Sequence, residues 1–283
     1  MAILMDGRQM AEKIKAQLKP KISELRQKGV SPKIAVVLAG DNEASSIYVR
    51  EKIKACEEVG IKTELVHLPE TDTARLINEI KKLNSDENVH SILVQLPLPE
   101  NANENAVLES ISPEKDVDCL NPLNLGRLLA GSEVVESCTP KGIIRMLDYY
   151  NIPLEGKNAV VINRSKIIGK PLALMLLRKN ATVRICHSKT RNIEDFTKNA
   201  DIVVIGVGRK KFLTGGMIKE GAVVIDAGIN KEEGRLFGDV DFSSVNGKAS
   251  YLTPVPGGVG PVTVAMVLEN TIMLAEKLSQ NSK

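Results

Sequence analysis

The stretch AVVINRSKIIGKPLAL (159–174) decides how the fold of this chain is interpreted. An apolar run, a short polar turn and a second apolar run predict a strand, a loop and the start of a helix. This order is typical of a dinucleotide-binding turn, although only Gly169 remains of the expected glycine pattern. A strand and a helix without any ligand would look the same, so other segments must decide between the two interpretations.

Further apolar runs on both sides of this stretch alternate with helical patterns. Near-continuous apolar strands are typical of parallel sheets that are covered on both faces, so the alternation predicts an α/β fold. The predicted strands are KIAVVLAG (33–40), ELVHLP (64–69), SILVQLP (91–97), NAVVIN (158–163), TVRICH (182–187), DIVVIG (201–206) and AVVIDAG (222–228). The predicted helices cover 43–59, ending at Gly60; 73–84, capped by Thr73; 6–28, which Pro20 kinks or divides; and 261–278.

The strands form two series, which predicts two α/β domains with parallel sheets and a cleft between them. A stretch rich in Pro, Asn and Gly (112–131) and the pair Thr139-Pro140 separate the series. We expect a first domain at 1–138, joined by the C-terminal helix 261–283, and a Rossmann-like domain at 139–260.

Composition excludes several classes of protein. The 283 residues are 43% hydrophobic and 26% charged, with a net charge of +3 and no dense basic run, so neither disorder nor nucleic-acid binding is expected. The amino terminus lacks the apolar core of a secretory signal, and no apolar run approaches membrane-spanning length, which predicts a cytoplasmic protein without membrane contact. The four cysteines and three histidines are scattered without a CxxC pair, so no disulfide scaffold or metal site is expected.

The predicted strand ends of the second half carry polar groups suited to a cofactor. After the second strand, CHSKTR (186–191) presents hydroxyls and cations where an NAD site more often presents an acidic residue. Arg164 and Ser188 can therefore hold a 2′-phosphate, which favours NADP over NAD. Lys189 and Arg191, taken individually, are better explained as a solvated basic turn. The turns GVG (206–208) and DAGIN (226–230) allow backbone to lie against a flat ligand.

The first half offers candidate chemistry with equally plausible structural explanations. Tyr48 and Lys52 share one helix face, but a lysine there is usually solvated. Gln95 ends an apolar strand, where it is either a capped strand end or a functional amide. Asp116 and Asp118 stand two apart, as turn aspartates often do. TPVPGGVGPVT (253–263) predicts a stiff turn before the last helix.

Together these segments resemble the bifunctional methylenetetrahydrofolate dehydrogenase and methenyltetrahydrofolate cyclohydrolase family over essentially the whole chain. The matching segments, in the family's order, are YVREKIKACEEVGI, ILVQLPLP, PEKDVD, CTPKGI, NRSKIIGKP, CHSKT, VVIDAGIN and TPVPGGVGPVTVA. Two departures stand out. Cys119 follows Asp118 where glycine is usual, so the turn must accommodate a side chain, and Asn163 replaces a frequent glycine, as the residue that best tolerates a left-handed backbone.

The resemblance implies a role for each matching position. Lys52 is central to the cyclohydrolase step, Gln95 contacts and tunes it, and Asp118 holds the pterin ring, whereas Asp116 is structural. The folate-binding residues are Tyr48, Val94, Leu96, Pro256, Gly257, Gly258, Val259 and Gly260, and the NADP-binding residues are Asn163, Arg164, Ser165, Ser188 and Ile229. The family forms homodimers, so a homodimer is expected.

The implied reaction oxidises 5,10-methylenetetrahydrofolate with NADP and then hydrolyses the methenyl product to 10-formyltetrahydrofolate. Three alternatives stay open. A dehydrogenase without cyclohydrolase activity is disfavoured by Lys52 and Gln95, and an NAD-using enzyme by Arg164 and Ser188. A catalytically silent nucleotide-binding regulator is disfavoured because Lys52 and Asp118 are both present.

Overall fold

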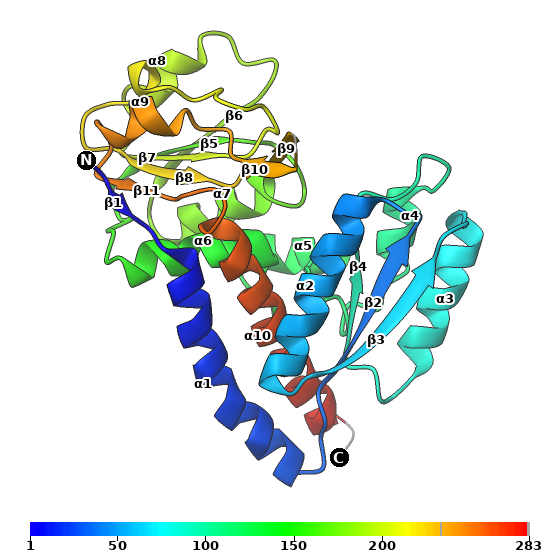
Figure 1. Ribbon diagram of the computed structural model, residues 1–283. Helices are drawn as coiled ribbons and strands as arrows, with labels where there is room; N and C mark the ends of the chain where they lie inside the picture. Colours follow the sequence, from blue (N-terminus) through cyan, green and yellow to red (C-terminus); the bar gives the residue numbers. More distant parts are fainter. Residues whose placement is uncertain (233, 282–283) are drawn as a thin grey trace. The chain divides into compact units, whose positions relative to one another are not determined.

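The computed structural model describes residues 1–232 and 234–281 and divides into two compact units. Unit 1 comprises Met1–Glu12 and Thr139–Thr263, and unit 2 comprises Lys13–Cys138 with the chain from Val264 onward. Both are layered α/β structures with parallel sheets, which confirms the predicted fold class (Figure 1). The units differ from the predicted domains at residues 1–12 and 261–263, which belong to unit 1.

Unit 2 is built on a three-stranded parallel sheet in the order β3-β2-β4. Its central strand β2 is buried along nearly its whole length, as expected for a strand covered on both faces. The strands are β2 (Lys33–Ala39), β3 (Lys62–Leu68) and β4 (Ser91–Val94), and the helices within the unit are α2 (Glu43–Val59), α3 (Thr73–Ser85), α4 (Glu104–Glu109) and α5 (Pro122–Ala130). Helices α1 (Gly7–Gln27) and α10 (Val259–Asn281) begin in unit 1 and continue in unit 2.

Local signals explain where these helices begin and end. The Asn42 side chain accepts a hydrogen bond from the backbone N–H of Ser45 and so caps α2, which ends at Gly60 with a left-handed φ of 91°. The predicted cap of α3 was wrong by one residue, because the carboxylate of Asp72, not Thr73, accepts from the N–H of Arg75 at 2.8 Å. Pro20 lies inside α1 but does not divide it.

Unit 1 contains a six-stranded parallel sheet in the order β1-β11-β8-β7-β5-β6. From β5 the chain moves outward to β6 and then crosses to β7 and β8 on the other side of β5. The strands are β1 (Ile3–Leu4), β5 (Asn158–Ile162), β6 (Thr182–Cys186), β7 (Ile202–Ile205), β8 (Val223–Asp226) and β11 (Tyr251–Leu252). Residues 1–12 belong to this unit because β1 pairs with β11.

The remaining elements of unit 1 complete its layers around this sheet. The helices are α6 (Cys138–Tyr149), α7 (Gly169–Arg178), α8 (Ile193–Thr197), α9 (Phe242–Asn246) and the short 3₁₀ turn η1 (Gly215–Met217). A short antiparallel hairpin of β9 (Asn230–Glu232) and β10 (Arg235–Phe237) follows β8 and has no counterpart in the predicted elements. Buried side chains of β5, β7 and β8 form the core, with Val203 and Val224 fully enclosed.

Helix α10 corrects the prediction that no apolar run approaches membrane-spanning length. Within the described residues, Val259–Gln280 is long and apolar enough by length and composition, but 61% of the apolar window is buried inside the fold. Two polar residues of the helix, Asn270 and Thr271, are also buried and paired. The amide of Asn270 donates to the carbonyls of Val117 and Glu136 at 2.9 and 2.8 Å, and the hydroxyls of Thr271 and Ser91 lie 3.0 Å apart. These are the contacts of a core helix.

Candidate functional site

A lysine and a glutamine meet at the carboxyl end of the unit 2 sheet. Lys52 lies on α2 and donates from Nζ to Oε1 of Gln95 at 3.0 Å. Gln95 follows β4, and its Nε2 donates to the carbonyl of Leu96 at 2.7 Å, while its backbone N–H bonds to Val37 of the neighbouring strand. The glutamine is therefore fixed in orientation and presents its acceptor oxygen to the lysine. Such an amine, half-buried and held in place, is suited to moving protons.

Tyr48 lies one helical turn before Lys52 and therefore on the same face of α2. Burial of its half-enclosed side chain is the main cause that raises the pKa of the hydroxyl, and the charge of Glu51 adds to it. The ring is accordingly neutral near pH 7 and offers an apolar face to a flat ligand. Val94 is almost fully buried in β4, whereas Leu96 is half-buried beside Gln95.

The loop that carries Asp118 runs alongside β4. The N–H of Ile92 donates to the carbonyl of Lys115 at 2.7 Å, and Ile92 forms a parallel bridge with Asp116. Because the pairing is parallel, the chain from Asp116 to Asp118 runs in the same direction as β4, toward the end of the strand that carries Gln95. The structure thus brings Asp118 to the same edge of the sheet as the Lys52–Gln95 pair.

The two aspartates of this loop have different partners. Asp116 is buried, and its carboxylate accepts from the backbone N–H groups of Leu120 and Asn121 and from the amide of Asn124 at 2.8–3.2 Å. Its role is to shape the turn. Asp118 is half-exposed, and none of the hydrogen bonds among the described residues ends on its carboxylate. Its oxygens are available to accept two N–H groups from a ligand.

Cys119, where glycine is usual, is accommodated without loss of the turn. It adopts a left-handed φ of 56°, and its side chain points inward and is fully buried. Burial is the main cause that raises the pKa of this thiol to about 12, so it stays protonated. The thiol is therefore a packing group beside Asp118.

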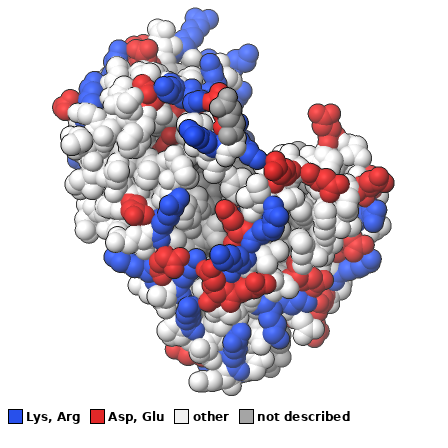
Figure 2. All heavy atoms as spheres, viewed as in Figure 1, with Lys and Arg blue, Asp and Glu red and all other residues white. Residues whose placement is uncertain are grey.

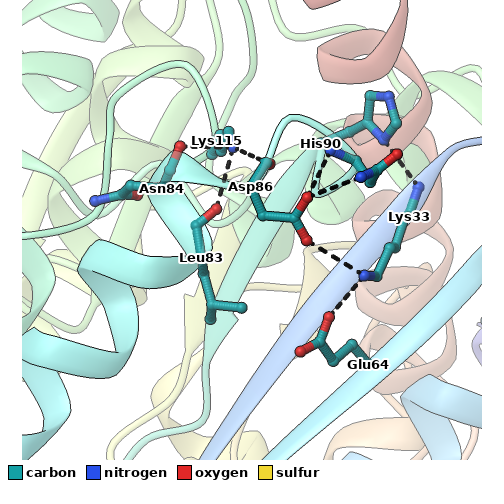
Figure 3. Close-up of polar contacts among 8 residues, drawn as sticks. Lys33, Glu64, Leu83, Asn84, Asp86, His90 and Lys115 are labelled. Carbon is teal, nitrogen blue, oxygen red and sulfur yellow. Dashed lines mark hydrogen bonds and ion pairs between the residues drawn. The ribbon is translucent and has the colours of Figure 1, made fainter.

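Lys115 fastens the same loop to the carboxyl end of α3 (Figure 3). Its Nζ donates to the carbonyls of Leu83, Asn84 and Asp86 at 3.1, 2.8 and 2.7 Å. These groups belong to the last turn of the helix and its cap, where the helix leaves carbonyls without internal partners. Burial lowers the pKa of this lysine. Lys115 was not predicted from the sequence, although it stands one residue before the Asp-x-Asp pair.

A second group of predicted residues lies where the chain of unit 1 changes direction in the sheet. The β5 and β7 strands are neighbours, but β6 lies on the far side of β5, so the crevice at the carboxyl ends of β5 and β7 is the switch point where open α/β sheets bind ligands. Asn163 follows β5, and Gly206 follows β7. The Nδ2 of Asn163 donates to the carbonyl of Gly206 and so joins the two loops.

Asn163 organises its loop by hydrogen bonds of its side chain. Its Oδ1 accepts from the backbone N–H groups of Ser165 and Gly169 at 2.7 and 3.0 Å. The expected reason for this residue was wrong, because its backbone is not in the left-handed region. Glycine is required instead at 169, where a Cβ would lie 2.1 Å from the carbonyl oxygen of Asn163. The Ser165 hydroxyl accepts from the N–H of Ile168 at 3.0 Å and completes the turn.

The predicted phosphate-binding residues lie on adjacent loops. Because Ile162 pairs with Cys186, Arg164 and Ser188 follow neighbouring strand ends, and both side chains are exposed. On the other side of the switch point, Ile229 follows β8 and is 50% exposed. Asn163, Arg164, Ser165, Ser188 and Ile229 therefore all lie at the carboxyl ends of unit 1 strands.

The segment 253–260 also belongs to unit 1 and leads into α10, whose first two residues it includes. Gly257 has a left-handed φ of 108°, and its carbonyl accepts from the N–H groups of Gly7 and Arg8 at 2.9 and 3.2 Å. A Cβ at Gly258 would lie 2.5 Å from the carbonyl oxygen of Pro254. The turn is thus rigid, with Pro256 and Gly260 exposed.

Among the described residues, no group of three His, Cys, Asp or Glu side chains is arranged to hold a metal ion. On the face drawn in Figure 2, Lys and Arg are interspersed with Asp and Glu. This face therefore lacks the continuous basic surface that nucleic acid binds.

Comparison with known proteins places both units in one family. The family model of the tetrahydrofolate dehydrogenase/cyclohydrolase catalytic domain matches residues 5–118, and that of its NAD(P)-binding domain matches residues 137–279. The chain is 54% identical to the bifunctional protein FolD of Thermodesulfovibrio yellowstonii, over 97% of each chain.

Two solved structures are similar over nearly the full length. FolD-methylenetetrahydrofolate dehydrogenase/cyclohydrolase from Campylobacter jejuni is 48% identical with a TM-score of 0.95, covering 98% of this chain and 99% of that one. The Trypanosoma brucei enzyme, complexed with NADP cofactor and inhibitor, is 39% identical with a TM-score of 0.94, covering 98% of both chains. These matches confirm the predicted resemblance: the chain belongs to the tetrahydrofolate dehydrogenase/cyclohydrolase family.

Proposed function

We propose that this protein is a bifunctional enzyme of one-carbon metabolism. It oxidises 5,10-methylenetetrahydrofolate to 5,10-methenyltetrahydrofolate with NADP, and then hydrolyses the methenyl product to 10-formyltetrahydrofolate. Within a chain of this family, the observation that carries the second activity is the Lys52–Gln95 hydrogen bond of 3.0 Å. The oxidation transfers a hydride and needs no protein acid or base, so we assign this lysine to the hydrolysis.

The oxidation needs binding and orientation, because the methenyl cation that forms is stabilised by the two folate nitrogens on either side of it. NADP, when bound, supplies the acceptor for the hydride. The residues at the switch point of unit 1 fit this cofactor. Arg164 and Ser188, exposed on adjacent strand ends, supply a cation and a hydroxyl for a 2′-phosphate, and Asn163 and Ser165 hold the loop between them in shape.

Hydrolysis adds water to the methenyl carbon. The water loses both of its protons as its oxygen becomes the formyl oxygen. One proton is released to solvent and the other reaches N5 as the bond from this carbon to N5 breaks, which leaves the formyl group on N10. Lys52 carries protons in these steps, and Gln95 holds its amine in position through Oε1. Asp118, whose carboxylate is not used by the turn, accepts the N–H groups of the pterin edge. Tyr48 supports this assignment because its neutral ring offers stacking surface to the folate.

The other predicted folate contacts, Val94, Leu96 and Pro256–Gly260, stay predictions. We also propose a homodimer. Strand β6 is an edge of the unit 1 sheet, and its Ile185 is 41% exposed, which favours pairing with another chain. The four buried free thiols favour a reducing, cytoplasmic location. The absence of nucleic-acid and membrane partners also stays a prediction.

The test measures both activities on the full-length protein. Methylenetetrahydrofolate is supplied with NADP or with NAD, and reduced nicotinamide is followed. Hydrolysis of methenyltetrahydrofolate is compared separately with the rate in buffer. We expect reduction with NADP and accelerated hydrolysis. Reduction with neither cofactor would refute the function, reduction only with NAD would refute the cofactor assignment, and reduction without accelerated hydrolysis would leave a dehydrogenase.

A further inference from the structure

Unit 1 contains a fully buried carboxylate that is outside the predicted site. Asp239 follows the β9–β10 hairpin and has no exposed surface. Its Oδ2 accepts from the backbone N–H groups of Val207 and Gly208, and its Oδ1 accepts from the N–H of Arg209 at 2.7 Å and from Nδ2 of Asn230 at 2.8 Å. Three successive backbone N–H groups thus converge on one carboxylate.

A second buried carboxylate holds the first in place. Asp226, at the end of β8, accepts from the N–H groups of Gly228, Asp239 and Val240 at 2.9–3.0 Å. The two glycines beside the carboxylates leave no room for a side chain. A Cβ at Gly228 would lie 2.2 Å from the carboxyl carbon of Asp239, and one at Gly238 would lie 1.9 Å from Oδ2 of Asp226. The two carboxylates can therefore occupy these positions only because both of these residues are glycines.

The loop that Asp239 binds is part of the switch point. It follows β7, and the carbonyl of Gly206 accepts the side-chain amide of Asn163 from the loop after β5. The loop faces outward beyond this point, since Gly208 and Arg209 are exposed. A change in the position of Asp239 would therefore move this loop, which forms one side of the proposed cofactor crevice.

Successive backbone N–H groups that point to one spot form an anion-binding nest, which in other loops binds phosphate. Here the nest at 207–209 already contains the negative charge of Asp239. A phosphate group is therefore excluded from this side of the crevice by occupied donors and by repulsion. The cations and hydroxyls that suit phosphate, Arg164 and Ser188, lie on the opposite side, at the ends of β5 and β6.

We infer that Asp239 is a positioning residue of the dehydrogenase. It fills the nest at 207–209 and fixes this side of the switch point, so that a part of NADP without phosphate groups lies against the loop. The inference rests on the proposed function. It concerns only the first activity, because the hydrolysis of methenyltetrahydrofolate uses Lys52, Gln95 and Asp118 of unit 2 and consumes no NADP.

The test is Asp239→Asn in the full-length protein, compared with Asp241→Asn. An asparagine has one acceptor oxygen, so its Nδ2 must face either the N–H groups of Val207 and Gly208 or those of Arg209 and Asn230. The two N–H groups that face Nδ2 each lose their acceptor, and each lies against another donor. Asp241→Asn removes the same charge two residues away, where the carboxylate accepts, among the described residues, only from the Ser243 hydroxyl at 3.1 Å.

We expect the KM for NADP to rise about tenfold or more in Asp239→Asn, the size of one lost bond to a charged group. The KM for methylenetetrahydrofolate at saturating NADP and the cyclohydrolase rate should stay within about twofold of wild type, as should every parameter of Asp241→Asn. This split separates positioning from general structural damage, which would reduce both activities.

An unchanged KM for NADP in Asp239→Asn would overturn the inference, and so would an equal loss of both activities. If that variant does not fold, Asn230→Ala removes one of the four bonds to the carboxylate and should raise the KM for NADP about two- to fivefold, with hydrolysis intact. An unchanged KM there would also overturn the inference. Wild-type protein without either activity would instead refute the proposed function.

Discussion

Replacing Gln95 by alanine should slow hydrolysis of methenyltetrahydrofolate much more than it slows oxidation. The substitution removes the acceptor that holds Nζ of Lys52 at 3.0 Å and the donor that ties the side chain to Leu96 at 2.7 Å. A hydrogen bond to a charged group contributes about 1.5–3 kcal/mol, and each 1.4 kcal/mol changes a rate tenfold. If this bond positions Lys52 in the transition state, kcat of the cyclohydrolase falls by about 10- to 150-fold.

Two assays on the same preparation measure the effect. Loss of methenyltetrahydrofolate, corrected for the rate in buffer, gives the cyclohydrolase rate, and reduced NADP formed from methylenetetrahydrofolate gives the dehydrogenase rate. The dehydrogenase should change by less than about threefold, because no proton transfer is needed in that step. Gln95→Glu is the matched comparison, since it keeps an acceptor for Lys52. The reasoning would be refuted by a cyclohydrolase rate within threefold of wild type, or by equal losses in both assays.

Three further predictions concern the supports of the site. Lys115→Met leaves three carbonyls at the end of α3 without their donor, so urea unfolding should show a loss of about 3 kcal/mol, and the KM for folate should rise as Asp118 shifts; an unchanged unfolding midpoint would contradict this. Gly169→Ala places a Cβ 2.1 Å from the Asn163 carbonyl, so it should cost about 1–3 kcal/mol and raise the KM for NADP, whereas a neutral effect would show that the loop can relax. Burial is the main cause that raises the pKa of Asp226 to about 6, above about 3.9 in the unfolded chain, so the folded state binds this proton more tightly and stability falls as pH rises from about 4 to 6. Between pH 4 and 7 the wild type should lose about 3 kcal/mol relative to Asp226→Asn, and parallel stability profiles would exclude the effect.

The main strands were predictable because their burial is continuous. Buried parallel strands must be apolar on both faces, so KIAVVLAG and DIVVIG stand out, and the structure confirms them as β2 and β7. The pairing of β1 with β11 was not predictable, because two strands of two residues carry no periodicity and their partners stand far apart in the chain. For the same reason the sequence did not show that residues 1–12 belong to unit 1.

The site shows a similar division. Lys52 and Gln95 were found through short segments that resemble a family, and the structure adds the bond between them. The sequence shows Asn163 only as a missing glycine. Its side chain makes three hydrogen bonds, and one of them joins Gly206 at the end of a neighbouring strand, which the sequence alone does not show. Asp239 was missed because an aspartate in a turn usually bonds its own backbone, whereas this one binds a loop about thirty residues earlier. The Asp-x-Asp pattern of 239–241 has the same spacing as that of 116–118, and this spacing is a sequence signal by which Asp239 could have been considered.

The most direct test of the account is Lys52→Met, which keeps much of the side-chain volume and removes the amine. We predict that methenyltetrahydrofolate is then hydrolysed no faster than in buffer, while NADP is still reduced with methylenetetrahydrofolate at a substantial fraction of the wild-type rate. Retention of both activities would remove Lys52 from the mechanism. Loss of both together would contradict the assignment of this lysine to the second step alone.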